Sequence, residues 1–170
     1  MKTQKNMVNT TLCYIEKDNC YLMLHRTKKE NDYNHDKWIG IGGKFEVGES
    51  PEDCVMREIR EETGLSVAPE DLEYCGIVTF VDTTPSEPYT EFMHIFRVRT
   101  FSGSLLIDCD EGDLEWVPFS KLKELPHWQA DEIFYDFLEQ KRDFFSLKCI
   151  YKNNKLVKTY LSGREYNHWE

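Results

Sequence analysis

Three glutamates lie at spacings that suit a metal ion. Glu58, Glu61 and Glu62 stand three and four residues apart in the run REIREE. Residues at that spacing share one face of a helix, where like charges destabilise a bare helix by about 0.2–0.5 kcal/mol per pair. Hard divalent cations such as Mg²⁺ or Mn²⁺ take oxygen ligands of this kind and would offset the repulsion. The run therefore predicts a metal site.

The flanking residues predict the helix that this spacing requires. Ser50 is a preferred N-cap residue, Pro51 suits the first helical position, and Glu52 and Asp53 are favourable near the positive helix end. Gly64 follows the last polar turn, where glycine most easily adopts the left-handed conformation that ends a helix. We expect the helix to lie between Ser50 and Gly64.

Four glycines precede this helix, at Gly40, Gly42, Gly43 and Gly48. They predict a loop whose backbone approaches another group closely. Carboxylates by themselves repel phosphate, so a glycine-rich loop leading into an acidic helix suggests a phosphate that is held through a metal ion.

The stretch from residue 43 to residue 65 resembles the Nudix box, G-x5-E-x7-R-E-U-x-E-E-x-G-U, in which U is a bulky aliphatic residue. Every fixed position is filled, by Gly43, Glu49, Arg57, Glu58, Ile59, Glu61, Glu62, Gly64 and Leu65. A chance match is on the order of 10⁻⁹ per starting position. A solvated charged helix is the ordinary alternative, but it explains neither the box glycines Gly43 and Gly64 nor Glu49. The resemblance implies metal-dependent hydrolysis of a nucleoside diphosphate joined to another group.

The resemblance also implies roles for residues in the box. Glu58, Glu61 and Glu62 are the expected ligands of Mg²⁺ or Mn²⁺, with the carbonyl of Gly42 as a backbone ligand. Glu62 is the favoured ligand and Glu58 the favoured general base. Glu61 could exchange roles with either, because clustered carboxylates share protons and metals. Arg57 is expected to orient Glu61 rather than to touch the substrate.

Two further acids have open assignments. Glu111 lies in the acidic loop 108–113, which could be a solvated turn or could supply an extra metal ligand or base. Glu49 could stand behind the metal ligands or anchor the helix, and the first interpretation is favoured.

Residues outside the box resemble the MutT-type branch, which hydrolyses oxidised nucleoside triphosphates such as 8-oxo-dGTP and so sanitises the nucleotide pool for DNA synthesis and repair. The residues that carry this resemblance are Trp38 with Gly42, Gly43 and Lys44, Asp110 with Glu111, Trp116, Trp128 with Asp131, and the stretch 144–160. That resemblance implies a substrate site of six residues: Arg26, Trp38, Gly43, Lys44, Trp128 and Asp131. Lys44 and Arg26 are the expected phosphate contacts. Trp128 would stack on a purine and Asp131 would pair with its edge, although burial in the core is an equal alternative for Trp128.

Two departures from this branch bear on base specificity. Some relatives carry two adjacent acids where this chain has Ala130 before Asp131, and an asparagine where it has Ile39. The hydrolytic residues are unaffected. An ADP-ribose or nucleotide-sugar pyrophosphatase and an RNA 5′ pyrophosphohydrolase are alternatives, and a non-catalytic nucleotide sensor is a third that the complete set of box glutamates disfavours.

Composition limits the other classes. At 170 residues the chain is expected to form a single domain, 1–170. The net charge of −10 disfavours binding to a nucleic-acid duplex, so the expected partner is a small nucleotide. The six cysteines lack a CxxC pair and no apolar run approaches the length of a membrane span. With the polar start at residues 1–5, these features predict a cytoplasmic protein with reduced thiols, monomeric or homodimeric, without a membrane partner.

Hydrophobic periodicity predicts an α/β fold, a mixed sheet between helices as in the Nudix α/β/α sandwich. The expected strands are 10–16, 21–26, 72–81, 91–100, 114–117, 145–151 and 155–161, and a second helix covers 130–140. Turns at 17–19 and 153–154 predict hairpins.

Overall fold

The computed structural model describes residues 6–170, so the polar start at residues 1–5, used above to predict localisation, lies outside the described residues. The strands are β1 (Met7–Lys17), β2 (Cys20–His25), β3 (Trp38–Ile39), β4 (Leu72–Asp82), β5 (Tyr89–Val98), β6 (Asp113–Pro118), β7 (Phe145–Lys152), β8 (Lys155–Leu161) and β9 (Arg164–Glu165). The helices are α1 (Pro51–Thr63) and α2 (Asp131–Glu139), with short 3-10 turns η1 (Pro69–Asp71) and η2 (Phe119–Glu124).

The strands form one mixed sheet, as predicted. Their order is β3-β2-β1-β5-β4-β7-β8-β9, with β6 paired to β2. The β1–β5 and β4–β7 pairs are parallel, and the other pairs are antiparallel. The predicted fold class is confirmed.

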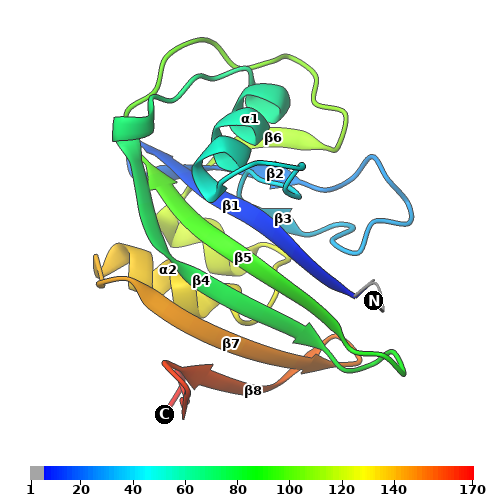
Figure 1. Cartoon of the computed structure of the whole chain (residues 1–170). Coiled ribbons are helices and arrows are strands. Elements are labelled where there is room, and N and C mark those ends of the chain that lie inside the picture. Colours follow the sequence, from blue (N-terminus) through cyan, green and yellow to red (C-terminus); the bar gives the residue numbers. More distant parts are fainter. Residues whose placement is uncertain (1–5) are drawn as a thin grey trace.

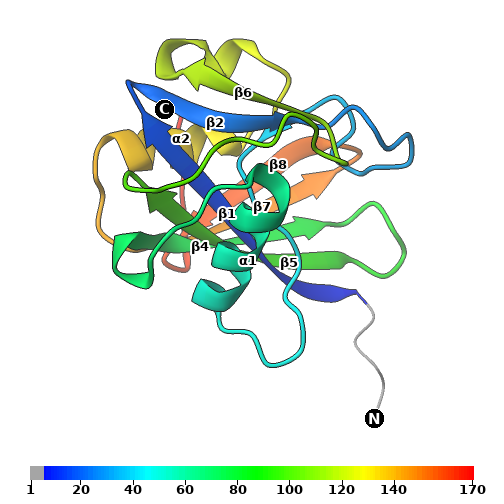
Figure 2. The ribbon, with the colours of Figure 1, turned by 90° about the horizontal axis from the view of Figure 1, so that it is seen from above.

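The two helices lie on opposite sides of strands β1 and β4 (Figure 2). Because side chains alternate along a strand, β1 supplies both cores. Tyr14 packs in the cluster that contains the buried residues of α2, whereas Cys13 and Ile15 pack with Val55 and Ile59 of α1. The helical layer on the α1 side is incomplete, since α1 covers the β1–β2 end and leaves β4, β7 and β8 without a helix over them (Figure 1).

Element boundaries differ from the sequence prediction by a few residues, and four short elements (β3, β9, η1 and η2) were not predicted. The two-residue strands β3 and β9 are too short for a periodic pattern and exist through pairing with a neighbouring strand, and the 3-10 turns η1 and η2 lack the period of an α-helix. Both predicted hairpins are present. Asp18 and Asn19 have φ of 51° and 58°, and Asn153 and Asn154 have φ of 50° and 61°, values that suit two-residue turns.

Two other expectations concern the whole chain. All six cysteines are free, and all but Cys20 are buried. Within residues 6–170, neither helix has the length and apolar character needed to cross a membrane.

The start of α1 is fixed by reciprocal hydrogen bonds. The Asp53 amide donates to Ser50 Oγ at 3.1 Å, and the Ser50 amide donates to Asp53 Oδ2 at 3.0 Å. This capping box satisfies two backbone donors that the first turn leaves without partners. At the other end Gly64 has φ of 78° and donates to the Arg60 carbonyl at 3.0 Å. The predicted helix boundaries are therefore confirmed.

The capping box can be tested by a single substitution. Ser50→Ala should lower the free energy of unfolding by about 1 kcal/mol, because the Asp53 amide loses its acceptor. Ser50→Thr keeps a hydroxyl and is the matched control. Urea unfolding of the three proteins measures the difference, and equal stabilities of the alanine and threonine variants would contradict the assignment.

Candidate active site

One cavity of about 900 Å³ collects nearly all of the predicted site residues. It lies among α1, the glycine loop, the β2–β3 loop, α2 and one face of the sheet. The predicted residues that line it are Arg26, Gly42, Gly43, Lys44, Arg57, Glu58, Glu61, Glu62, Glu111, Trp128 and Asp131. Trp38 is the exception.

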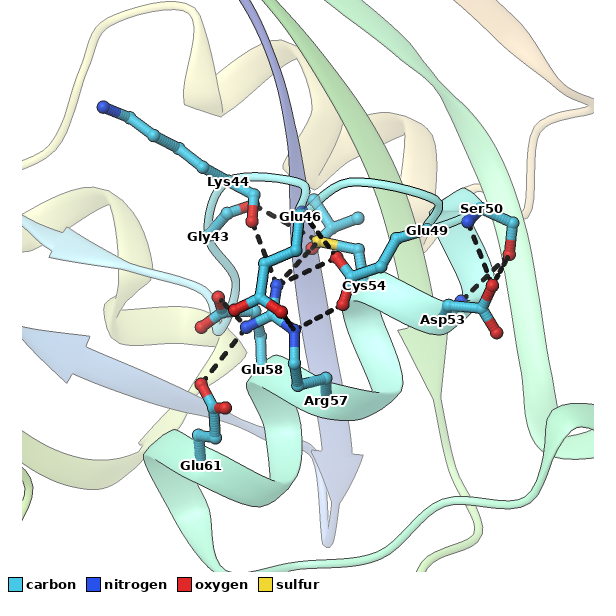
Figure 3. Close-up of polar contacts among 11 residues, drawn as sticks. Gly43, Lys44, Glu46, Glu49, Ser50, Asp53, Cys54, Arg57, Glu58 and Glu61 are labelled. Atoms are coloured by element: carbon cyan, nitrogen blue, oxygen red, sulfur yellow. Dashed lines mark hydrogen bonds and ion pairs between the residues drawn. The ribbon is translucent and has the colours of Figure 1, made fainter.

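Arg57 organises the acidic side of this cavity (Figure 3). Its guanidinium donates to both carboxylate oxygens of Glu49, at 2.5 and 3.0 Å, and to Glu58 at 2.7 Å. It also donates to Glu61 at 3.2 Å and to the Lys44 carbonyl at 3.0 Å. Arg57 reaches Glu61 as expected, but Glu49 and Glu58 are its shorter contacts. Since a guanidinium is a rigid planar donor, these bonds fix the carboxylates relative to the glycine loop.

The contacts of Glu49 explain why the box includes it. The hydrogen bonds from Arg57 lower the pKa of Glu49 to about 2. Glu49 Oε2 also accepts from the Glu46 amide at 2.8 Å. Glu49 therefore stays ionised and links the loop to α1 through Arg57. Its contacts are those of a residue that supports the acidic wall of the cavity, which consists of Glu58, Glu61, Glu62 and Glu111.

A second group of charges lies deeper in the cavity. Glu62 is only 7% exposed, and burial, together with the adjacent Glu111, raises its pKa to about 9. Glu111 lies 49 residues further along the chain and forms an ion pair with Arg26, which also donates to Asp32 at 2.5 Å. Glu111 is thus not a solvated turn residue, because the fold places its carboxylate beside the box.

These contacts change the expectation for Arg26. It lines the cavity, as a phosphate contact would, but its guanidinium is bound by the carboxylates of Asp32 and Glu111. Lys44 is exposed, and its side chain extends away from the Arg57 cluster (Figure 3). Of the two basic residues, Lys44 therefore has the freer charge for a phosphate.

The predicted ligand atoms are of the kind that a hard divalent cation prefers. All five predicted ligands supply oxygen and line one cavity. The carbonyls of Ile41 and Gly43 accept backbone bonds from Cys13 and Thr11, at 2.6 and 2.9 Å. Within residues 6–170, no donor contacts the Gly42 carbonyl between them, so that oxygen is available to a ligand. Burial and Glu111 raise the pKa of Glu62, and a cation bound here would offset the same buried negative charge that a proton offsets.

The expected convergence of three glutamates is not present in this arrangement. In the part of the chain that the structure describes, no three His, Cys, Asp or Glu side chains are gathered closely enough to hold a metal as they stand. The side chain of Glu61 is 58% exposed and bonds to Arg57, whereas Glu62 is buried. Adjacent residues leave a helix in different directions, so the spacing that aligns each of them with Glu58 does not bring Glu61 and Glu62 together.

Trp38 is placed away from the cavity. Its ring stacks on His25, with centroids 4.4 Å apart and planes inclined by 7°. In β3, Trp38 and Ile39 point to opposite faces because successive strand residues alternate, and Ile39 lines the cavity instead. The structure thus gives no support to the expectation that Trp38 binds substrate.

The far end of the cavity contains Trp128 and Asp131. Trp128 is 8% exposed and belongs to the core, yet it also lines the cavity. Its Nε1 donates to Asn34 at 2.8 Å, and the ring of Tyr33 stacks on it. Asp131 is 6% exposed and accepts from the Trp128 amide at 3.3 Å. Burial raises its pKa to about 8.

Sequence reasoning missed two residues at this end, Tyr33 and Asp82. Both line the cavity, and the Tyr33 hydroxyl donates to Asp82 at 2.6 Å. Tyr33 lies in a polar loop without periodicity, and Asp82 ends a strand whose side chains alternate between faces. Only that alternation, counted from buried Val78 and Phe80, could have placed Asp82 on the cavity face.

Comparisons with known proteins identify the family to which the chain belongs. A sequence model described as the NUDIX domain matches residues 6–138. The chain is 30% identical over 129 residues to the uncharacterized Nudix hydrolase YvcI of Bacillus subtilis, covering 75% of this chain and 77% of that protein. It is 30% identical over 116 residues to the oxidized purine nucleoside triphosphate hydrolase of Danio rerio, covering 68% and 71%. A crystal structure of a MutT protein from Bacillus halodurans superposes with a TM-score of 0.80 at 25% identity, covering 91% of this chain and 97% of that one.

The buried Asp131 carboxyl predicts a pH-dependent stability. Its pKa is about 8 in the folded chain and 3.8 ordinarily. The stabilisation from its retained proton is complete below the unfolded pKa and is lost as the pH rises through the folded one. Asp131→Asn, a neutral replacement of similar shape, should therefore raise the free energy of unfolding more at pH 8 than at pH 5, by at least about 1 kcal/mol. Urea unfolding at both pH values measures this, and an equal effect at both would contradict it.

Proposed function

We propose, from the premise that this chain belongs to the Nudix family and is a hydrolase of MutT type, that it converts a purine nucleoside triphosphate to the monophosphate and pyrophosphate. An oxidised purine substrate such as 8-oxo-dGTP is the first candidate. The observation that carries the proposal is that one cavity joins an acidic wall to an aromatic end with a buried carboxyl. Such a cavity suits a substrate with phosphates at one end and a base at the other.

At the acidic end, Glu58, Glu61, Glu62, Glu111 and the Gly42 carbonyl would hold divalent cations, Mg²⁺ or Mn²⁺. Nudix hydrolases generally depend on divalent metal ions. Bound there, the metal would neutralise phosphate charge and lower the pKa of a water molecule. The exposed Lys44 ammonium would contact the phosphates from the glycine loop.

Glu58 is our candidate for the general base. It lines the cavity, and burial raises the pKa of its carboxyl while Arg57, which donates to it at 2.7 Å, opposes that shift. A raised pKa makes a carboxylate a better proton acceptor near neutral pH. Arg57 would keep the Glu58 oxygens oriented through the bonds that also fix Glu49 and Lys44.

At the other end, Trp128 and Asp131 would recognise the base. With its pKa raised to about 8, Asp131 carries its proton at neutral pH and can donate to an acceptor on a purine. The Danio rerio relative is named for the hydrolysis of oxidised purine nucleoside triphosphates, which supports a purine here. Because Ala130 and Ile39 replace an acid and an asparagine that some relatives carry, other residues would have to select among purines.

We also propose that residues 1–170 act as one domain. In the described part, β7, β8 and β9 extend past the NUDIX match but belong to the same sheet as the box-bearing half. Their side chains, among them Leu147 and Tyr151, fill the core under α2.

Removal of the metal should abolish activity. Excess EDTA is expected to stop triphosphate hydrolysis, and added Mg²⁺ or Mn²⁺ should restore it, as measured by release of pyrophosphate. Turnover that continues undiminished in EDTA would rule out the metal assignment.

Glu62→Gln tests the buried ligand. The amide has the shape of the carboxyl but lacks its charge, so kcat should fall by at least about 100-fold with the fold intact. Glu70→Gln, on an exposed glutamate outside the cavity, should leave kcat unchanged. Near-normal turnover of Glu62→Gln, with an unchanged melting temperature, would remove Glu62 from the site.

Asp131→Asn tests base recognition. The substitution turns a proton-sharing acid into an amide with fixed donor and acceptor atoms, so kcat/KM should change between purine triphosphates by about tenfold. The assay compares 8-oxo-dGTP and the ordinary dNTPs, with ADP-ribose and capped or triphosphorylated RNA as alternative substrates. If every base is affected equally, Asp131 does not read the base. A wild-type preference for ADP-ribose or RNA would overturn the proposed function itself.

A further inference from the structure

The ring of Tyr33 stacks on Trp128, the residue proposed above as the platform for the base. Tyr33 lies in the loop between β2 and β3, and its ring centroid is 5.2 Å from that of Trp128, with the planes inclined by 21°. A planar base needs about 3.5 Å on each side. It therefore cannot enter between these two rings while Tyr33 stays in place.

The hydroxyl of Tyr33 has a partner that a base could also use. It donates to Asp82 Oδ2 at 2.6 Å, while Asp82 Oδ1 accepts from the Thr84 amide at 2.9 Å. Asp82 is 6% exposed and lines the same cavity as Trp128. Tyr33 thus offers Trp128 an aromatic ring and offers Asp82 a hydrogen-bond donor. A purine with a ring or exocyclic N–H has the same two features.

Tyr33 is half-exposed in this position. Its residue surface is 48% exposed, so its departure does not open the main core. The two residues that flank Tyr33 are held by polar contacts: Asn34 accepts from Trp128 Nε1, and Asp32 accepts from Arg26. Arg26 in turn pairs with Glu111 in the acidic wall. The loop therefore contacts both ends of the substrate cavity.

We propose that Tyr33 is a stand-in for the substrate base, and that a purine binds by displacing its ring from Trp128 and taking over its hydrogen bond to Asp82. This inference rests on the proposed function, since it takes Trp128 as the base platform. It adds Tyr33 and Asp82 as residues that determine specificity.

The displaced hydroxyl sets a requirement on the incoming base. Once Tyr33 leaves, the buried Asp82 carboxylate loses a donor, and a buried acceptor without a partner is costly. A base that presents an N–H satisfies it, whereas unsubstituted purine has no N–H donor once it is joined to the sugar. The site should therefore select donor-bearing purines, such as guanine or 8-oxoguanine, over unsubstituted purine.

The test is equilibrium binding of nucleoside monophosphates by calorimetry, without divalent metal. The probes are dGMP, 8-oxo-dGMP and the monophosphate of unsubstituted purine deoxyriboside. Tyr33→Ala removes the competing ring, so the dissociation constants for dGMP and 8-oxo-dGMP should fall by about two- to tenfold. Tyr33→Phe removes only the hydroxyl and should have a smaller effect of the same sign. The unsubstituted purine should bind the wild-type protein at least about fivefold more weakly than dGMP.

A distant tyrosine supplies the control. Tyr160→Ala, on β8 and outside the cavity, should leave all three dissociation constants unchanged. Melting temperatures establish that each variant is folded. Unchanged or weaker binding by both Tyr33 variants would overturn the inference. Unchanged binding would show that the ring does not compete with the base, and weaker binding would show that Tyr33 contacts the bound base. If neither the wild type nor Tyr33→Ala binds any purine monophosphate, the proposed function fails and the inference falls with it.

Discussion

The bonds of the Arg57 guanidinium are the interaction on which the candidate active site depends. The chain places acidic side chains close together on α1 and beside it, and in isolation they would repel one another. Arg57 offers several donors in one plane, and it uses them on Glu49, Glu58 and Glu61 and on the backbone of Lys44. The Arg57 guanidinium thereby supports the acidic wall and attaches the glycine loop to helix α1.

Burial raises the pKa of one carboxyl at each end of the cavity, and the residues around each carboxyl make the two ends different. Near α1, burial and the adjacent Glu111, which pairs with Arg26, raise the pKa of Glu62, and a bound cation would offset the charge that burial disfavours. At the aromatic end, desolvation raises the pKa of Asp131 to about 8 in an apolar setting beside Trp128. Acids of similar intrinsic strength are thus suited to ligate a metal at one end and to donate a hydrogen bond at the other. The difference lies in their surroundings and not in their side-chain chemistry.

The sheet lies between the two helices, and each of its faces packs against one of them. Its β1 strand carries Cys13 and Ile15 toward α1, while Tyr14 packs toward α2. The glycine loop lies against β1, and a side chain at Gly42 would come within 1.8 Å of the Thr11 carbonyl. The close approach at this glycine holds the loop at the cavity wall. The β2–β3 loop then reaches from the acidic wall to Trp128, so both ends of the cavity contact one segment.

The sequence by itself determined the parts of this protein that depend on neighbours along the chain. Helix α1, its caps at Ser50 and Gly64 and the contact of Arg57 with Glu61 follow from helical spacing, which is the same in any fold. Strand periodicity gave the mixed sheet and both hairpins, with errors only at boundaries and in very short elements. Tertiary structure decided what lies far apart in sequence: Glu111 beside Glu62, Tyr33 on Trp128 and Asp82, and Trp38 turned toward His25. These contacts depend on strand order, register and loop path, which the pairing of distant strands sets and no local spacing encodes.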